Sequence, residues 1–348
     1  MNTKAEQNTV DISFCLPMYN VRPYLEDCLQ SILHQDLGSR GISYEIFFID
    51  DLSSDGSFEW LSEQTGRIPG LRVERNPENK GVSYTRNRLV REAKGKYIWF
   101  IDPDDMLIRN VTGTFFTLAE AHQADVFLGN YVRVPEDATE SDEYVFSGNA
   151  EEVHVENSNK EAPRDRAGKK MSAVWAGLFL RSFLLDNGLT MNEKMVAQED
   201  TLFYYQYRMR SQRIFQCDAE CYLYRQRASS VMNTRNDQRA RKYYFSMVEM
   251  LRVYREHLDT GDYTDKELLE DKISHSQQNV AQCLAGIRDK AFIKEQLKEL
   301  KARGDYPYKL RSAAFKVKPF YMGCLIFLLP CKPFFWLYHS IYMARHKS

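Results

Sequence analysis

The first 130 residues predict an α/β fold with a mainly parallel β-sheet that helices flank on both sides. Two observations carry this prediction. Short apolar runs typical of buried strands alternate with stretches whose apolar residues recur at helical spacing. The resulting β-α-β-α order requires crossover connections, which join parallel strands. Ligands bind such sheets at the carboxyl ends of the strands, so polar residues directly after each run are candidate site residues.

Each element is predicted from its own pattern. Strands are expected at 11–16, 44–49, 71–74, 97–101 and 125–128, where short apolar runs occur. Helices are expected at 22–35, 55–64, 82–93 and 114–122. In the first of these, the apolar residues fall on one helical face, and Gly95 follows the third, as is common after a helix.

The composition changes along the chain and predicts three regions. We expect an α/β domain over residues 1–235, a charged helical region over 236–303, and a basic, aromatic tail over 304–348. Within the first region, residues 131–170 are polar and acidic, which favours a loop or small hairpin insertion. The mixed pattern of helix and strand resumes from residue 171.

The overall composition excludes several classes of protein. A net charge of -1 over 348 residues gives no general attraction to nucleic acid, so we expect no such partner. The seven cysteines are dispersed and form no CxxC pair, which disfavours a zinc site and predicts reduced thiols in a cytoplasmic protein. Residues 1–10 are polar, so no signal peptide is expected.

Acidic residues follow two of the predicted strands. Asp50 and Asp51 come after the second, and Asp102 and Asp104 come after the fourth. Residues of this kind also occur as ordinary turn and cap residues, which is the role expected of Asp55. Two carboxylates held behind a buried strand are costly without a cation. Oxygen ligands suit Mg²⁺ or Mn²⁺, which complete their coordination with phosphate and water, so a diphosphate substrate is expected.

Five motifs stand in order along the chain. They are Pro17-x-Tyr19-Asn20, Asp50-Asp51-x-Ser53-x-Asp55-Gly56-Ser57, Asn79-x-Gly81-x-Ser83 with Arg86-Asn87, Asp102-x-Asp104, and Glu199-Asp200. Together they resemble the motifs of family 2 glycosyltransferases, of the bacterial capsular or exopolysaccharide type. The resemblance covers roughly residues 10–230. It implies the GT-A fold, a Rossmann-like sheet flanked by helices, and inverting, metal-dependent sugar transfer from a nucleotide diphosphate donor.

The resemblance also assigns roles to single residues. The implied nucleotide-binding residues are Pro17, Tyr19, Asn20, Asp50, Asp51, Arg86 and Asp102. Asp104, with Asp102, is the implied ligand of Mn²⁺ or Mg²⁺. Asp200 or Glu199 is the implied catalytic base, and the sequence leaves the choice between them open. A carboxylate at position 51 suits the N3–H of uracil, so UDP is the expected nucleotide.

Several of these assignments have ordinary alternatives. Arg86 is equally compatible with a solvated helix face. Trp175 is expected either to line the acceptor pocket or to be a core residue. Glu199 and Asp200 also suit the first turn of a helix, where the helix dipole favours acids. Leu52 departs from the family pattern, which has a small residue there.

Residues 301–348, which include the tail, contain nine Lys or Arg residues and one acid, Asp305. Residues 320–338 are almost all apolar and rich in aromatics, but Pro330, Lys332 and Pro333 interrupt them, so a regular spanning helix is not expected. Aromatic and basic residues together suit attachment to the inner face of a membrane. The alternatives are a helix docked on the protein and a dimer contact.

A membrane-attached enzyme fits a lipid-linked saccharide acceptor. The alternative function is a catalytically inactive scaffold at the membrane that binds nucleotide-sugars. The presence of both Asp104 and Asp200 disfavours that alternative.

Overall fold

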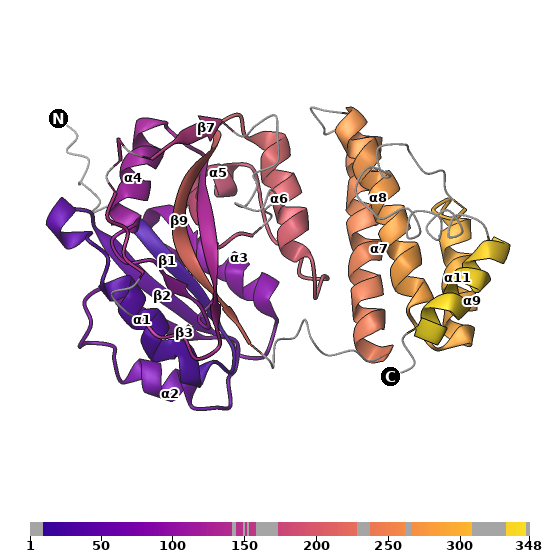
Figure 1. Ribbon diagram of the computed structural model, residues 1–348, viewed down its shortest axis with the longest axis horizontal. Helices are drawn as coiled ribbons and strands as arrows, with labels where there is room; N and C mark the ends of the chain where they lie inside the picture. The colour runs from indigo at the N-terminus through magenta and orange to yellow at the C-terminus, as the bar shows by residue number, and fades with distance from the viewer. Residues whose placement is uncertain are drawn as a thin grey trace. The chain divides into compact units, whose positions relative to one another are not determined.

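The computed structural model describes residues 10–140, 144–148, 150–151, 153–157, 173–227, 237–261, 266–307 and 332–345 (Figure 1). The chain divides into two compact units. The first comprises Met1–Glu193 and Asp200–Ser230, and the second comprises Lys194–Glu199 and Val231–Ser348. The first unit is an α/β structure and the second is helical.

The first four strands form the parallel half of the sheet, in the order β3-β2-β1-β4. Their bounds are β1 Val10–Met18, β2 Tyr44–Asp50, β3 Leu71–Arg75 and β4 Gly95–Phe100. The α/β fold predicted from the N-terminal pattern is therefore confirmed. All four strands end at the same edge of the sheet, so the acidic residues that follow β2 and β4 lie at that edge.

The later strands make the sheet mixed. Strand β8 pairs antiparallel with both β4 and β6, while β6 pairs parallel with β9. Strands β5 and β7 both pair antiparallel with β9. The bounds are β5 Met106–Leu107, β6 Val126–Pro135, β7 Val155–Asn157, β8 Gly177–Leu180 and β9 Ile214–Gln226. Because β8 runs opposite to β4, residues that precede β8 lie beside the carboxyl end of β4.

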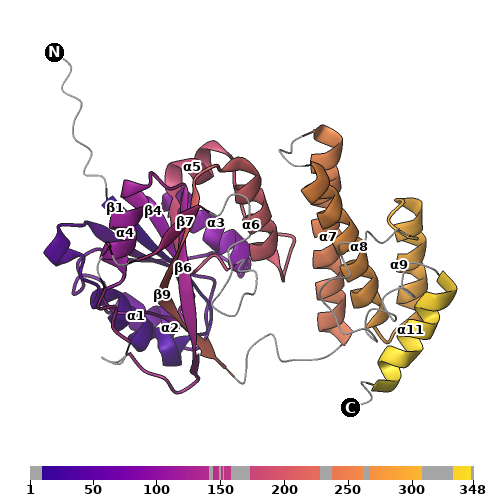
Figure 2. The same cartoon turned by 45° about the horizontal axis from the view of Figure 1, so that its top comes forward.

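Helices cover both faces of the sheet (Figure 2). One face packs against α1 Leu25–Leu33, α2 Ser57–Ser62 and α4 Thr112–Ala121. The other packs against α3 Val82–Glu92, α5 Arg181–Asp186 and α6 Glu199–Arg210. Each face of the sheet has its own hydrophobic core, and alternate residues of β1 point into the two cores. Phe14 and Leu16 lie in the core under α1, α2 and α4, and Cys15 lies in the core under α3, α5 and α6. Short 3₁₀ turns, η1 Arg22–Tyr24 and η2 Gly38–Arg40, flank α1.

The second unit contains the helices α7 Asp237–Thr260, α8 Lys266–Ala285, α9 Lys290–Ala302 and α11 Lys332–Arg345. In the tail, α11 packs on α8: the His339 imidazole Nδ1 lies 2.9 Å from the Ala285 carbonyl oxygen, and Phe335 is buried beside Tyr306. Most of the apolar segment at 320–338 precedes residue 332 and lies outside the described residues. Among the described helices, none combines the length and apolarity that a membrane span requires.

Candidate active site

Two loops at the carboxyl edge are joined by Asn20. Its backbone is left-handed, with φ 51°, and its N–H donates to Ser53 Oγ at 2.9 Å. The Ser54 N–H donates back to Asn20 Oδ1 at 2.9 Å. Pro17 lies in β1 two residues past Cys15, the last residue paired with β4. Because proline has no N–H, the ladder to β4 cannot continue there.

The two acids after β2 have different partners. Asp50 is fully buried, and its Oδ2 accepts a bond from Arg75 Nε at 2.6 Å. The Asp51 carboxylate accepts three hydrogen bonds, from Asn76 Nδ2 and the Lys80 N–H at 2.8 Å each and from the Gly81 N–H at 2.7 Å. Both acids therefore organise the loops around them, in addition to any contact with a nucleotide.

Two large side chains on these loops remain exposed. Tyr19 is 51% exposed and Leu52 is 44% exposed. Leu52 has φ 68°, a conformation that favours glycine and costs another residue about 1 kcal/mol. The departure of Leu52 from the family pattern therefore introduces local strain and exposes an apolar side chain on the loop that follows Asp51.

Three carboxylates cluster directly after β4. Asp102 pairs with Arg86 Nη2 at 2.6 Å, and Asp104 pairs with Arg227 Nη2 at 2.6 Å. The buried Asp105 accepts the Arg225 N–H at 2.8 Å. Burial, and then the charge of Asp102, raises the pKa of Asp104, although Arg227 opposes the change.

The pKa of Asp105 is raised more strongly. Its causes are burial, followed by the charges of Asp104 and Asp102. Burial and mutual repulsion together therefore outweigh the effect of the neighbouring guanidinium groups on the pKa of Asp104, and they raise that of Asp105 as well. This is the electrostatic setting in which a divalent cation binds favourably.

Arg86 connects this cluster to the segment after residue 190. Its side chain is only 6% exposed, which excludes the alternative of a solvated helix face. Its Nη1 lies 3.9 Å from Met191 Sδ. The neighbouring Asn87 holds the same segment through the Met191 backbone, donating to its carbonyl at 2.9 Å and accepting its N–H at 2.8 Å.

Trp175 lies in an aromatic stack next to the carboxylates. Its ring stacks on Tyr222 with centroids 4.4 Å apart and on Tyr224 with centroids 5.6 Å apart. The Tyr222 hydroxyl oxygen accepts the Asp102 N–H at 3.0 Å. Trp175 is only partly buried, so it combines a core contact with a surface beside the cluster, and both expected roles remain compatible with its position.

The Glu199–Asp200 pair begins α6. Asp200 Oδ1 accepts the N–H of Thr201 at 2.7 Å. The boundary between the two compact units passes between these acids, with Glu199 in the second unit and Asp200 in the first. The choice of base stays a prediction.

The residues directly after β4 offer carboxylate oxygens to a metal ion. Among the described residues, no group of three or more His, Cys, Asp or Glu side chains is arranged to hold an ion. The two carboxylates of Asp102 and Asp104 nevertheless fit an Mg²⁺ or Mn²⁺ whose remaining ligands are phosphate and water. Each carboxylate also has a guanidinium partner in the structure, so an ion would share or displace those contacts.

Sequence reasoning missed the importance of Arg75, Tyr222 and Arg227. Arg225 lies in β9 and Arg227 directly follows its last residue, Gln226. A spacing of two places side chains on one face of a strand, so the sequence could have indicated that these two arginines act together. The Arg225 guanidinium donates to the carbonyls of Asp104, Glu136 and Ala138, so it connects the segment after β4 to the segment after β6.

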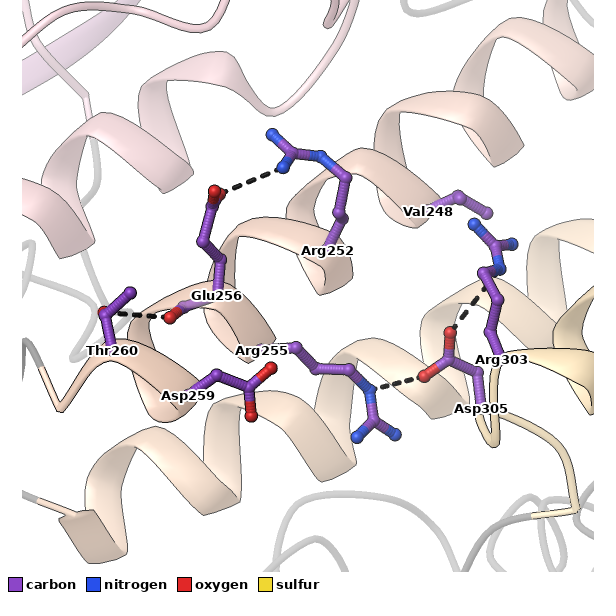
Figure 3. A pocket seen from close by; sticks show the side chains of 8 residues that line it. All are labelled: Val248, Arg252, Arg255, Glu256, Asp259, Thr260, Arg303 and Asp305. Atoms are coloured by element: carbon purple, nitrogen blue, oxygen red, sulfur yellow. Dashed lines mark hydrogen bonds and ion pairs between the residues drawn. The ribbon is translucent and has the colours of Figure 1, made fainter.

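The second unit contains a separate hollow of about 280 Å³ (Figure 3). Arg252 and Arg255 project along it from α7. Arg252 pairs with Glu256 at 2.9 Å and Arg255 pairs with Asp305 at 2.5 Å. Because these guanidinium groups already have carboxylate partners, the hollow favours no particular ligand.

Curated proteins similar to this chain include glycosyltransferases. "Glycosyltransferase GlyG" of Streptococcus pneumoniae is 26% identical over 230 residues, which are 65% of this chain and 74% of that protein. "Uncharacterized glycosyltransferase EpsJ" of Bacillus subtilis is 26% identical over 63% of this chain and 62% of that protein. "Poly(ribitol-phosphate) beta-glucosyltransferase" of Bacillus spizizenii is 31% identical over 34% of this chain, but the match spans only 18% of that protein.

Solved structures share the fold. The S. aureus TarS fragment 1-349, solved in complex with UDP-GlcNAc, has a TM-score of 0.60 and 18% identity, with 97% of this chain and 92% of that chain covered. The mannosyltransferase PcManGT from Pyrobaculum calidifontis, solved with GDP-Man and Mn²⁺, has a TM-score of 0.52 and 16% identity, with 98% and 89% covered. Residues 13–187 match the family model described as "Glycosyl transferase family 2". This chain therefore belongs to glycosyl transferase family 2 and is a glycosyltransferase with the GT-A fold.

Proposed function

We propose that this enzyme transfers a sugar, with inversion, from a UDP-sugar to an acceptor hydroxyl in a divalent-metal-dependent reaction. Residues 1–235 are the proposed catalytic domain, residues 236–303 a helical region, and residues 304–348 a tail that attaches the cytoplasmic enzyme to the membrane. The proposed acceptor is a lipid-linked saccharide in cell-surface polysaccharide synthesis.

The observation that carries the proposal is the cluster of Asp102, Asp104 and Asp105 at the end of β4. Its carboxylate oxygens are ligands that a divalent cation prefers, and Asp102 and Asp104, each with a guanidinium partner, would hold it. When bound, Mn²⁺ or Mg²⁺ supplies Lewis-acid stabilisation of the departing diphosphate. The complexes of TarS with UDP-GlcNAc and of PcManGT with GDP-Man and Mn²⁺ support this ligand chemistry.

The chain's own residues have separate tasks in this reaction. Asp200, or Glu199, accepts the proton of the acceptor hydroxyl as its oxygen bonds to the anomeric carbon. The bond from that carbon to the diphosphate oxygen breaks, and its electron pair leaves with the diphosphate. Arg86 holds the Asp102 carboxylate in place at 2.6 Å, and the exposed ring of Tyr19 offers a surface for the base.

Trp175 is the proposed acceptor contact. Sugar rings present apolar faces that pack on aromatic side chains. The partly exposed Trp175 ring stacks on Tyr222, and the Tyr222 hydroxyl oxygen accepts a hydrogen bond from the Asp102 N–H. The name of the poly(ribitol-phosphate) beta-glucosyltransferase supports a polymer as the wider class of acceptor. The tail's basic and aromatic composition supports attachment to an anionic membrane face.

The second candidate is a scaffold that binds nucleotide-sugars without catalysis. Donor hydrolysis separates the two. The full chain is incubated with Mn²⁺ and a panel of UDP-, GDP- and dTDP-sugars, and the released nucleotide diphosphate is measured. We expect release from a UDP-sugar that stops with a chelator or with Asp104→Ala, and falls with Asp200→Asn.

A matched control is Asp137→Ala, which removes an exposed carboxylate of the same unit and should leave release unchanged. Metal-dependent UDP binding without release, even when saccharide acceptors are supplied, would favour the scaffold. No metal-dependent nucleotide binding at all would contradict both candidates.

A further inference from the structure

The two carboxylates proposed to hold the metal have different guanidinium partners. Asp102 pairs with Arg86 and Asp104 pairs with Arg227, at 2.6 Å in both cases. Arg86 lies within α3, is almost fully buried, and contacts Met191 through its Nη1. It is held in place from two sides.

Arg227 is the more exposed of the two arginines. It lies one residue beyond the end of β9, and its side chain is 23% exposed. Its guanidinium lies over the Tyr24 ring, 5.3 Å from the centroid. A cation can remain on that aromatic face when its ion pair with Asp104 is broken. Arg227 therefore has another contact available when it leaves Asp104, on a ring that the Arg225 guanidinium also approaches, 5.1 Å from the centroid.

We propose that Arg227 is a built-in counter-ion of Asp104 that competes with the divalent cation for this carboxylate. The proposal rests on the assignment of Asp104 as a metal ligand. A guanidinium that donates to Asp104 Oδ2 occupies a lone pair of that oxygen and repels a second cation. Metal affinity is then set by the strength of the Arg227–Asp104 pair as well as by the ligands themselves.

The test measures Mn²⁺ binding to the full chain in the absence of nucleotide. Binding is followed by calorimetry and by the loss of the electron paramagnetic resonance signal of free Mn²⁺. In Arg227→Gln the charge is removed, and we expect binding about tenfold tighter than in the wild type, equivalent to about 1.4 kcal/mol. Arg227→Lys keeps the charge and should stay close to the wild type. Arg241→Gln removes a guanidinium from a similar ion pair, 2.7 Å from Asp289, and should have no effect.

Two further variants keep the outcome interpretable. Arg227→Met retains packing on Tyr24 without charge and replaces Arg227→Gln if that variant fails to fold. Asp104→Asn must abolish the binding in every background, and if it does not, the assignment of Asp104 in the proposed function is wrong. If Asp104→Asn abolishes binding but neither uncharged variant binds Mn²⁺ more tightly than the wild type, the competition is overturned while the metal site stands.

Discussion

Substitution of Asp51 tests whether its carboxylate holds the loops at this site in place. The residue is 4% exposed, and its carboxylate accepts three hydrogen bonds, two at Oδ1 and one at Oδ2. Hydrogen bonds to a charged group contribute about 1.5–3 kcal/mol each. Two of the donors are loop amides, those of Lys80 and Gly81, which water can reach after truncation. We therefore expect Asp51→Ala to destabilise the α/β unit by about 4 kcal/mol.

Asp51→Asn should cost less, about 2 kcal/mol, because its remaining oxygen keeps the two bonds at Oδ1 while its new amide faces the Gly81 N–H. The measurement is urea unfolding followed by tryptophan fluorescence, which reports on Trp60, Trp99 and Trp175 in this unit. Since the chain has two compact units, the transition of the α/β unit is fitted separately.

Asp137→Ala is the control and should change stability by less than about 0.5 kcal/mol. A loss below about 1 kcal/mol in Asp51→Ala would refute the view that this carboxylate holds the loop together. In that case a loss of donor binding would report on nucleotide contact alone.

The remaining predictions concern the carboxylate cluster and its aromatic neighbour. Arg86→Gln leaves Asp102 without its buried cation, so stability should fall by about 3 kcal/mol, and an unchanged urea midpoint would contradict the pairing. Trp175→Ala removes the stack on Tyr222 and should raise the acceptor KM more than the donor KM, with Trp175→Phe intermediate; equal effects on both would argue against an acceptor contact. The raised pKa of Asp105 means that ionisation costs the folded state, so Asp105→Asn should gain stability over the wild type as pH rises from 4.5 to 8 in chelator, and a pH-independent difference would contradict the shift.

Much of the parallel half of the sheet could be predicted because its strands β1, β2 and β4 are buried on both faces. Runs such as 46–49 and 97–101 are apolar throughout, and their periodicity differs clearly from that of the helices. The later strands were harder to predict from the sequence. Strand β6 extends to Pro135, into residues expected to form a loop or small hairpin insertion, because pairing with β9 supports a stretch whose own pattern is polar.

Local sequence also placed the acids at the ends of β2 and β4, since a residue after a buried strand must lie at the edge of the sheet. It could not say what each acid touches. Asp51 turns to the loop before α3 and Asp104 turns to Arg227, a residue 123 positions further along the chain. Such pairs are selected by the packing of distant elements, which no short-range pattern encodes.

The sequence by itself determined the α/β class, the family and the positions of the carboxylates, because these depend on periodicity and motif spacing. The tertiary structure alone decided that Arg86 is a buried partner of Asp102, that Trp175 stacks beside the cluster, and that Arg227 neutralises Asp104. The physical reason is that charge and burial are properties of three-dimensional surroundings. They arise only when β4, β8, β9 and α3 come together at one edge of the sheet.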